Sequence, residues 1–189
     1  GAGDAPAPQA DETYNLARQI GEGLSYDTIS VSEGGTYNNG EATAGATITF
    51  QVWASGVTLD DNQEIIVTLN GTEVNPTSTT GRNTYSITMP SQDSVLAARI
   101  ATYYDITTVV TPTGGGSVNV SKTRAEQGDV ITVSASAASN YELETLKWSY
   151  DSSSEDINSG GTFTMPASNV TVTATFKATE PDPEPAKYT

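Results

Sequence analysis

Apolar residues alternate with threonine and serine along many short stretches of this chain. The clearest stretch lies near its end, where Val172, Ala174 and Phe176 alternate with Thr173 and Thr175. A period of two places successive side chains on opposite faces of a strand, so this pattern predicts a strand with one buried face. Similar alternation predicts further strands at residues 47–54, 65–69, 106–111 and 146–150.

The pattern near the end of the chain has a diverged earlier copy. Superposing the Met-Pro pair at Met89 on the pair at Met165 gives a period of 165 − 89 = 76 residues. The apolar positions of residues 96–100 then coincide with those of residues 172–176. A repeat of this length can close a small hydrophobic core of its own, so we predict two domains of one kind.

The two predicted repeats occupy residues 26–101 and 102–178. Each begins with a Tyr-Asp pair, at Tyr26 in the first repeat and at Tyr104 in the second. The connection between them is short, which predicts restricted hinging and a packed interface. Tyr103 and Tyr104 lie at this joint, and we expect at least one of the two rings in an interface between the repeats.

Both flanks of the repeats have the composition of linkers. Residues 1–25 begin with Gly, Ala, Pro and acidic residues, and they are predicted to form a flexible tether. A short helix is expected at residues 12–20, because Leu16 and Ile20 are four residues apart. Residues 179–189 combine Pro with acidic residues and are predicted to form an extended linker.

The predicted fold class is all-β, with two tandem small β-sandwich or β-grasp-like repeat domains of the same fold. Asn-Gly pairs at Asn39 and Asn70 predict tight hairpin turns. The apolar pattern changes parity between Leu143 and Leu146, which predicts a β-bulge. If residues 144–148 formed a helical turn instead, each repeat would have the β-grasp-like form with a helix.

The net charge of the chain limits which classes of molecule can be its partners. The chain has 189 residues, with 23 acidic and 8 basic side chains and a net charge of −15. This charge repels phosphate backbones and anionic lipid headgroups, which excludes nucleic acid as a partner. The charge indicates either the solubility of an exposed protein or the binding of cations or of a basic partner.

The chain has neither Cys nor His, which excludes disulfides, Ser-His pairs and His-ligated metals. Paired carboxylates such as Glu142 and Glu144 lie in contexts typical of solvated surface rather than of a glycosidase. Asp60, Asp61 and Glu64 lack the ordered spacing of a calcium loop and favour a turn. We therefore expect no catalytic residue, no metal and no cofactor, and a protein that is not an enzyme.

The two tryptophans have different expected roles. Trp53 lies on the polar face of its predicted strand, beside Thr49 and Gln51, and is the candidate ligand-facing residue. An exposed indole can stack on a sugar or anchor a protein partner. The alternative for Trp53 is packing on a neighbouring loop or on the second repeat. Trp148 shares a face with Leu146 and is expected in the core.

The second repeat carries a pattern along nearly its whole length. A glycine turn at residues 114–116 is followed by the string GDVITVSA, by an aromatic strand around Trp148 and by the closing string TFTMPASNVTVTATFK. In these features it resembles the divergent internalin B-type repeat of bacterial surface proteins. The first repeat resembles this family mainly at its glycine turn and at its Thr-Met-Pro string, which contains Met89. It departs in lacking a counterpart of Trp148 and in carrying Trp53 where the second repeat has Ser136.

The resemblance implies tandem surface modules without a catalytic motif. Such repeats occur on secreted and cell-surface proteins, many from Gram-positive bacteria and gut Bacteroidetes, where they act as spacers or adhesive domains. We therefore expect a non-enzymatic module, extracellular or on the outer cell surface of a bacterium, that acts in adhesion or as a spacer. A carbohydrate-binding accessory domain of a polysaccharide-utilisation system is the alternative. The expected partner is a glycan or a host or cell-surface protein.

The acidic, Pro-containing start also resembles the spacer that follows the lipidated cysteine of a bacterial lipoprotein. This resemblance implies a lipidated Cys ahead of Gly1 in the full-length protein. We therefore expect a fragment of a Bacteroidetes-like surface lipoprotein, peripheral to the membrane through that lipid anchor.

Overall fold

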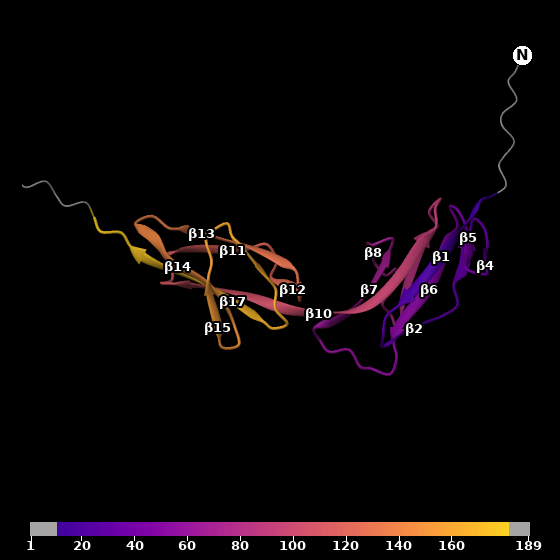
Figure 1. The fold of residues 1–189 in the computed structure, drawn as a ribbon, viewed down its shortest axis with the longest axis horizontal. Coiled ribbons are helices and arrows are strands. Elements are labelled where there is room, and N and C mark those ends of the chain that lie inside the picture. Colours follow the sequence, from indigo (N-terminus) through magenta and orange to yellow (C-terminus); the bar gives the residue numbers. More distant parts are fainter. Residues whose placement is uncertain (1–10, 182–189) are drawn as a thin grey trace, which may run out of the picture. The chain divides into compact units, whose positions relative to one another are not determined.

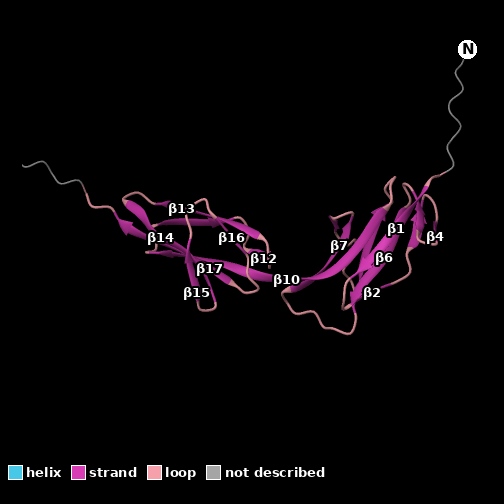
Figure 2. Cartoon of the chain, in the orientation of Figure 1, coloured by secondary structure: helices cyan, strands magenta, loops and turns pink. Residues whose placement is uncertain are grey.

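The chain folds into two compact units, residues 1–101 and residues 102–189. The computed structural model describes residues 11–181, and within that range every regular element is a strand (Figure 2). The all-β fold class predicted from the alternating pattern is therefore confirmed. The part of the chain described here contains no helix that could span a membrane. Most of the predicted tether and C-terminal linker, residues 1–10 and 182–189, lies outside the described residues.

The first unit is built around a long strand that it shares with the second (Figure 1). Its strands are β1 (Thr13–Ile20), β2 (Leu24–Tyr26), β3 (Ser30–Glu33), β4 (Tyr37–Asn38), β5 (Glu41–Thr43), β6 (Thr47–Ala54), β7 (Gln63–Leu69), β8 (Thr72–Val74), β9 (Asn83–Thr88) and the first part of β10 (Ser94–Thr111). Strand β1 pairs with β10 in parallel and with β5 in antiparallel orientation. Strand β6 lies between β9 and the pair β2 and β3 in a second sheet.

The second unit begins with the remaining part of β10. Its other strands are β11 (Gly116–Val120), β12 (Arg124–Glu126), β13 (Val130–Ala137), β14 (Tyr141–Tyr150), β15 (Ser153–Asp156), β16 (Thr162–Thr164) and β17 (Val170–Ala178). One sheet has the order β15-β14-β17-β10, with β12 beside β10, and the other has the order β11-β13-β16. Strands β10 and β17 are parallel, as β1 and β10 are in the first unit.

The two units share one pairing pattern, anchored at the Met-Pro pairs. Met89 and Met165 are both buried, and their carbonyls accept backbone hydrogen bonds from Gly45 and Gly128 at 2.8 and 2.9 Å. In the register of the sheets, the residue two before each Met pairs with an isoleucine, Ile48 or Ile131. The superposition with a period of 76 residues is therefore a structural equivalence.

The start of the first unit differs from the sequence expectation. Leu16 pairs with Ser94, and Ile106 pairs with Val170, where positions 94 and 170 are related by the repeat period. Strand β1 is thus the counterpart of the second part of β10. The residue two before Leu16 is a tyrosine, so Tyr104 does not correspond to Tyr26, and residues 13–25 belong to the first unit.

The predicted helix at residues 12–20 is wrong. This segment forms β1, in which Leu16 is buried and Tyr14 and Ile20 pack against the core. A spacing of four residues fits a strand as well as a helix, because four is a multiple of the strand period. Parallel pairing with β10 satisfies the backbone of this segment and decides between the two structures.

The predicted turns and the predicted bulge are confirmed. Asn39 and Asn70 have φ values of 50° and 51°, and the glycine after each has a φ of 82°. Two successive positive φ values define the type I′ turn that closes a two-residue hairpin. In β14 the register with β17 shifts between Leu143 and Thr145.

Each unit has its own hydrophobic core. Phe50 stacks on Tyr85 in the first core, with ring centroids 5.5 Å apart. In the second core Trp148 packs against the buried cluster and stacks on Phe163 at 4.6 Å. Residues 144–148 lie within β14, which pairs with β15 and β17, so the helical turn of the β-grasp-like alternative does not form.

Candidate functional site

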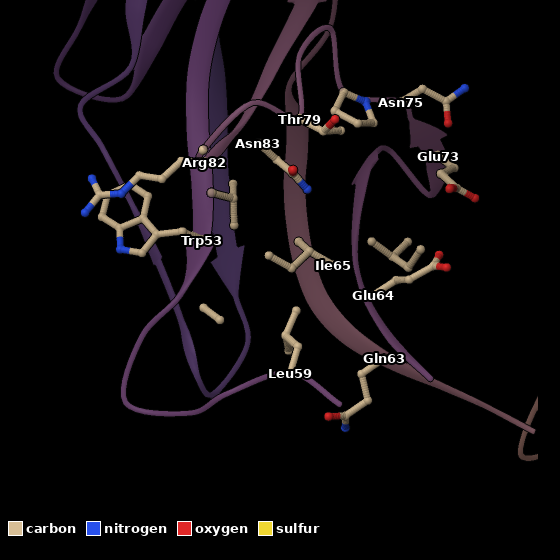
Figure 3. Close-up of a pocket in the computed structure, with 15 residues that line it drawn as sticks. Trp53, Leu59, Gln63, Glu64, Ile65, Glu73, Asn75, Thr79, Arg82 and Asn83 are labelled. Atoms are coloured by element: carbon tan, nitrogen blue, oxygen red, sulfur yellow. The ribbon is translucent and has the colours of Figure 1, made fainter. Parts of the chain in front are cut away.

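The first unit contains a cleft of about 540 Å³ (Figure 3). Its lining comes from β6, β7, β8, the start of β9 and the loops of residues 55–62 and 75–82. It consists of Val52, Trp53, Ala54, Leu59, Gln63, Glu64, Ile65, Ile66, Glu73, Asn75, Pro76, Thr79, Gly81, Arg82 and Asn83. Small-molecule sites in proteins have volumes of about 300–1,000 Å³, with an apolar lining and a few polar groups. The cleft has this size and this mixture of groups.

The floor of the cleft is apolar and its rim is polar. In the view of Figure 3, Ile65 lies between Asn83 and Leu59. The Asn83 amide donates a hydrogen bond to the hydroxyl of the buried Tyr85 at 3.3 Å. On the rim, the Glu64 and Glu73 carboxylates lie together at one side of the view. Carboxylates and amides above apolar carbon are groups that bind the hydroxyls and the ring faces of a sugar.

The loop that forms one wall is attached to β9 by backbone hydrogen bonds. The Thr77 amide donates to the Thr84 carbonyl at 2.7 Å, and the Thr84 amide donates to the Ser78 carbonyl at 2.9 Å. The Thr77 hydroxyl donates to the same Thr84 carbonyl at 3.2 Å. The wall is therefore held in place before any ligand binds, which lowers the ordering cost of binding.

Trp53 lines the cleft from the face of β6 that points away from the core. Its neighbours in the strand, Val52 and Phe50, are buried, and the indole itself is half-buried. The Arg82 guanidinium lies over the indole, 3.6 Å from the ring centroid (Figure 3). A cation over an indole at an exposed site contributes about 0.5–1 kcal/mol. Arg82 thus packs on one face of the ring, and a ligand-facing role for Trp53 stays a prediction.

Arg82 has no signal in the sequence pattern, because it follows a turn in a polar loop. Two other arginines also lie over aromatic rings, Arg18 over Tyr26 at 4.5 Å and Arg124 over Tyr103 at 4.2 Å. Three arginines that each lie over an aromatic ring form a recurring type of contact, and the sequence shows both residue types. The correct partners are known only once the strands are in register.

The joint residues Tyr103 and Tyr104 make contacts within the second unit. Both lie in β10 and pair with β12, Tyr103 with Glu126 and Tyr104 with Ala125. Tyr104 packs against the second core. An interface between the two repeats stays a prediction.

The acidic run after β6 forms a turn. The Gln63 amide donates to the Asp60 carbonyl at 3.0 Å, and the Gln63 side-chain oxygen accepts from the Asp60 amide at 3.0 Å. Among residues 11–181, no group of three or more His, Cys, Asp and Glu is arranged to hold a metal ion. This local pairing explains the polar residues of the run by turn chemistry.

One known protein family matches part of the chain. Residues 106–180 match the sequence profile described as "Divergent InlB B-repeat domain". This supports the repeat family for the second unit, to which the matched residues belong.

A search of curated proteins finds no match. Among solved structures, one similar chain is titled "Structure of the major pilin protein (T-13) from Streptococcus pyogenes serotype GAS131465". It has 10% sequence identity and a TM-score of 0.32, over 89% of this chain and 98% of the pilin. A likeness at this level gives no information on fold or function.

Proposed function

We propose that this protein is a non-enzymatic module of a bacterial cell surface that acts as a spacer. The observation that carries the proposal is the parallel pairing of the first and last strands of each unit, β1 with β10 and β10 with β17. Because parallel neighbours run in the same direction, the chain enters a unit at one end and leaves it at the opposite end. Such units add length to a chain, whereas antiparallel terminal strands return it to its start.

The repeat family matched by residues 106–180 supports the bacterial surface setting. The shared pairing pattern supports the further proposal that the first unit is a diverged copy of the same repeat, in tandem with the second. A chain without His or Cys supports a role that needs no nucleophile–base pair.

The spacer role is tested on intact cells. An epitope is placed after residue 189 of the protein in its native host, and residues 13–101 are deleted in a matched variant. We expect an antibody to label the variant less than the complete protein, because an antibody is bulky. A small dye that attaches covalently at the same position should label both proteins equally. Labelling of neither protein on intact cells would overturn the surface location, and equal antibody labelling would overturn the spacer role.

The second candidate function is recognition of a glycan, favoured by the cleft with its apolar floor and its rim of amides and carboxylates. Thr79 is exposed and lines the cleft, so Thr79→Trp fills it from the rim. Trp53→Ala removes the indole from the lining of the same cleft. Arg124→Ala is the matched control, since it removes an equivalent ring contact in the second unit.

We expect binding to a panel of mucin glycans and plant polysaccharides to be lost in Thr79→Trp and in Trp53→Ala, because both residues line the cleft. Binding by neither the original protein nor the control removes the glycan role. Hydrolysis of a glycoside panel, abolished by Glu64→Gln or Glu73→Gln, would overturn the non-enzymatic proposal.

Anchoring through lipid belongs to the same proposal. The expected anchor is a lipidated Cys ahead of Gly1, as in a Bacteroidetes surface lipoprotein. Growth of the native host with a clickable fatty acid should label the full-length product. An unlabelled product removes the lipid anchor and leaves the spacer proposal unaffected.

A further inference from the structure

The parallel terminal strands recur in both units and use the same hydrogen-bonding geometry. In the first unit five residue pairs, Leu16↔Ser94 to Ile20↔Ala98, join β1 to β10. In the second unit six pairs, Ile106↔Val170 to Thr111↔Thr175, join β10 to β17. These are the strands by which the chain enters and leaves each unit.

We propose that each parallel pair is a terminal-strand clamp that makes the unit resist tension applied through the chain. This inference rests on the proposed spacer function, because a spacer between a cell and a distal attachment carries the load between them. Tension on the two ends pulls parallel neighbours past one another along their length. All hydrogen bonds of the ladder are then loaded together, whereas a pair opened from one end breaks its bonds one after another.

Core packing adds to the resistance of the clamp in the second unit. The inward side chains of β17, from Val170 through Val172 and Ala174 to Phe176, are all buried. Sliding β17 along β10 moves these side chains out of a close-packed interior and exposes apolar surface to water. The equivalent stretch of β10 in the first unit buries less apolar surface, because Ser94 replaces Val170 and the half-buried Ile100 replaces the buried Phe176. The first unit is therefore expected to yield before the second.

A side-chain hydrogen bond ties the two clamp strands together at the same place in both units. The backbone amide of Asn15 donates to Asp93 Oδ1 at 2.9 Å, and the backbone amide of Asp105 donates to Asn169 Oδ1 at 2.9 Å. In each case the donor lies in the first clamp strand and the acceptor precedes the last paired stretch. The recurrence of this contact, with Asp in one unit and Asn in the other, indicates that the strand ends are held as part of the shared design.

Single-molecule force spectroscopy on the full chain, held by its two ends, tests the clamp. We expect two rupture events, each releasing roughly 25–30 nm at about 3.5 Å per extended residue. The chain has no Cys, so Thr107→Cys with Thr171→Cys introduces a single disulfide between registered residues of β10 and β17. Neighbouring strands are about 4.8 Å apart, within the Cα range of about 4.4–6.8 Å for disulfides.

With the disulfide oxidised, the rupture event of the second unit should disappear, and a reductant should restore it. The event of the first unit is the internal control. The disulfide shortens the released length whichever strands carry the load, so this variant assigns each rupture event to its unit, and the pulling direction tests the clamp.

A second pulling direction separates mechanical design from ordinary stability. Ser139→Cys gives a handle in the turn before β14, whose Tyr141 pairs with Ala178 at the end of β17. Load between this handle and the C-terminus opens β17 from β14 one pair at a time. The folded unit and its free energy of unfolding are the same in both experiments, so only direction differs.

We expect the rupture force of the second unit to be at least about twofold higher through the chain ends than through the Ser139→Cys handle at the same pulling speed. Equal forces, or a lower force through the chain ends, would overturn the clamp. Antibody labelling on intact cells would be unaffected by that result, so the spacer proposal is tested separately.

Discussion

The two units place their single tryptophans on opposite sides of the same scaffold. Trp53 pairs with Ser25 across β6 and β2 and lies under Arg82, away from the core. The equivalent residue of the second unit is Ser136, which pairs with Ser117. The tryptophan of the second unit, Trp148, packs inward on Phe163 instead.

This difference separates what the scaffold requires from what it permits. Strand pairing and the buried Met contacts recur in both units and are needed for folding. Residues on the outward face of β6 and in the loop of residues 75–82 contribute to the cleft and do not recur. Recognition, where the protein has it, is therefore expected in the first unit, and the second unit uses its aromatic residues for stability.

The largest expected effect comes from the buried methionines of the Met-Pro pairs, which recur in both units. Met89→Ala and Met165→Ala each remove a buried side chain, and each should lower the free energy of unfolding of its own unit by about 2–5 kcal/mol. Each unit carries one tryptophan, so Trp148→Phe leaves Trp53 as a reporter of the first unit, and Trp53→Phe leaves Trp148. Denaturant unfolding followed by fluorescence in both backgrounds measures the effect. A loss shared equally by both units would contradict their independence.

A somewhat smaller effect concerns a position that holds a leucine in the first unit and a glycine in the second. Leu24 pairs with Ala54 as Gly116 pairs with Ala137. A Cβ at Gly116 would clash with the Phe176 ring and with the backbone carbonyl oxygen of Ser136. We expect Gly116→Leu to destabilise the second unit by about 1–3 kcal/mol through overpacking.

The residue equivalent to Phe176 in the first unit is Ile100, which supplies the compensating change. Phe176→Ile should recover part of the loss in the Gly116→Leu background, whereas in the original protein it should only destabilise. Thermal unfolding of the three variants measures the coupling. Strict additivity of the two changes would show that the two side chains do not share this space.

The contact between Trp53 and Arg82 should have a modest effect. Arg82→Ala is expected to destabilise the first unit by about 0.5–1 kcal/mol, the usual contribution of an exposed cation over an indole. Arg124→Ala, which removes the guanidinium over Tyr103, should leave the first unit unchanged. A red shift of Trp53 fluorescence in Arg82→Ala alone would accompany exposure of the ring. No change in either quantity would show that the contact is not kept in solution.

The smallest expected effect depends on pH. Burial raises the pKa of Tyr85, the hydrogen bond from Asn83 lowers it by less, and Glu73 raises it further. The neutral hydroxyl is favoured in the folded state, so its stabilising contribution is complete below about pH 10, the pKa of an unfolded tyrosine. It is lost as pH rises through the higher folded value.

The position equivalent to Tyr85 in the second unit is Gly161, so this loss is specific to the first unit. Denaturant unfolding between about pH 8 and about pH 11 should show a steeper decline for the first unit than for its Tyr85→Phe variant. Parallel declines would assign the pH dependence to other tyrosines.

Local patterns predicted most strands and turns, because strand period and Asn-Gly geometry are properties of neighbouring residues. The bulge between Leu143 and Thr145 follows from the same parity. Strand β1 was missed, because the spacing of Leu16 and Ile20 fits two periods and its partner, Ser94, is far along the chain. Pairing at that distance is a property of the folded state.

The cleft could not be predicted for the same reason. Its groups come from four strands and two loops, and no local pattern in the sequence indicates that Asn83 and Ile65 lie near one another. The outward side of Trp53 followed from strand parity, but the guanidinium that covers one face of the ring is placed by a polar loop. Interactions within one strand were therefore accessible from sequence, and interactions between elements were not.

The two Asn-Gly turns also determine where the protein deamidates as it ages. In such a pair the glycine amide can attack the asparagine side chain and release ammonia, which requires the side chain to rotate. The Asn70 amide oxygen accepts from the Val95 amide at 2.8 Å, and its nitrogen donates to the Ser94 hydroxyl at 3.0 Å, so its rotation is restrained. Asn39 is exposed, and no side-chain hydrogen bond to it is found within residues 11–181. We expect peptide mass spectrometry of stored protein to find deamidation at Asn39 well before Asn70.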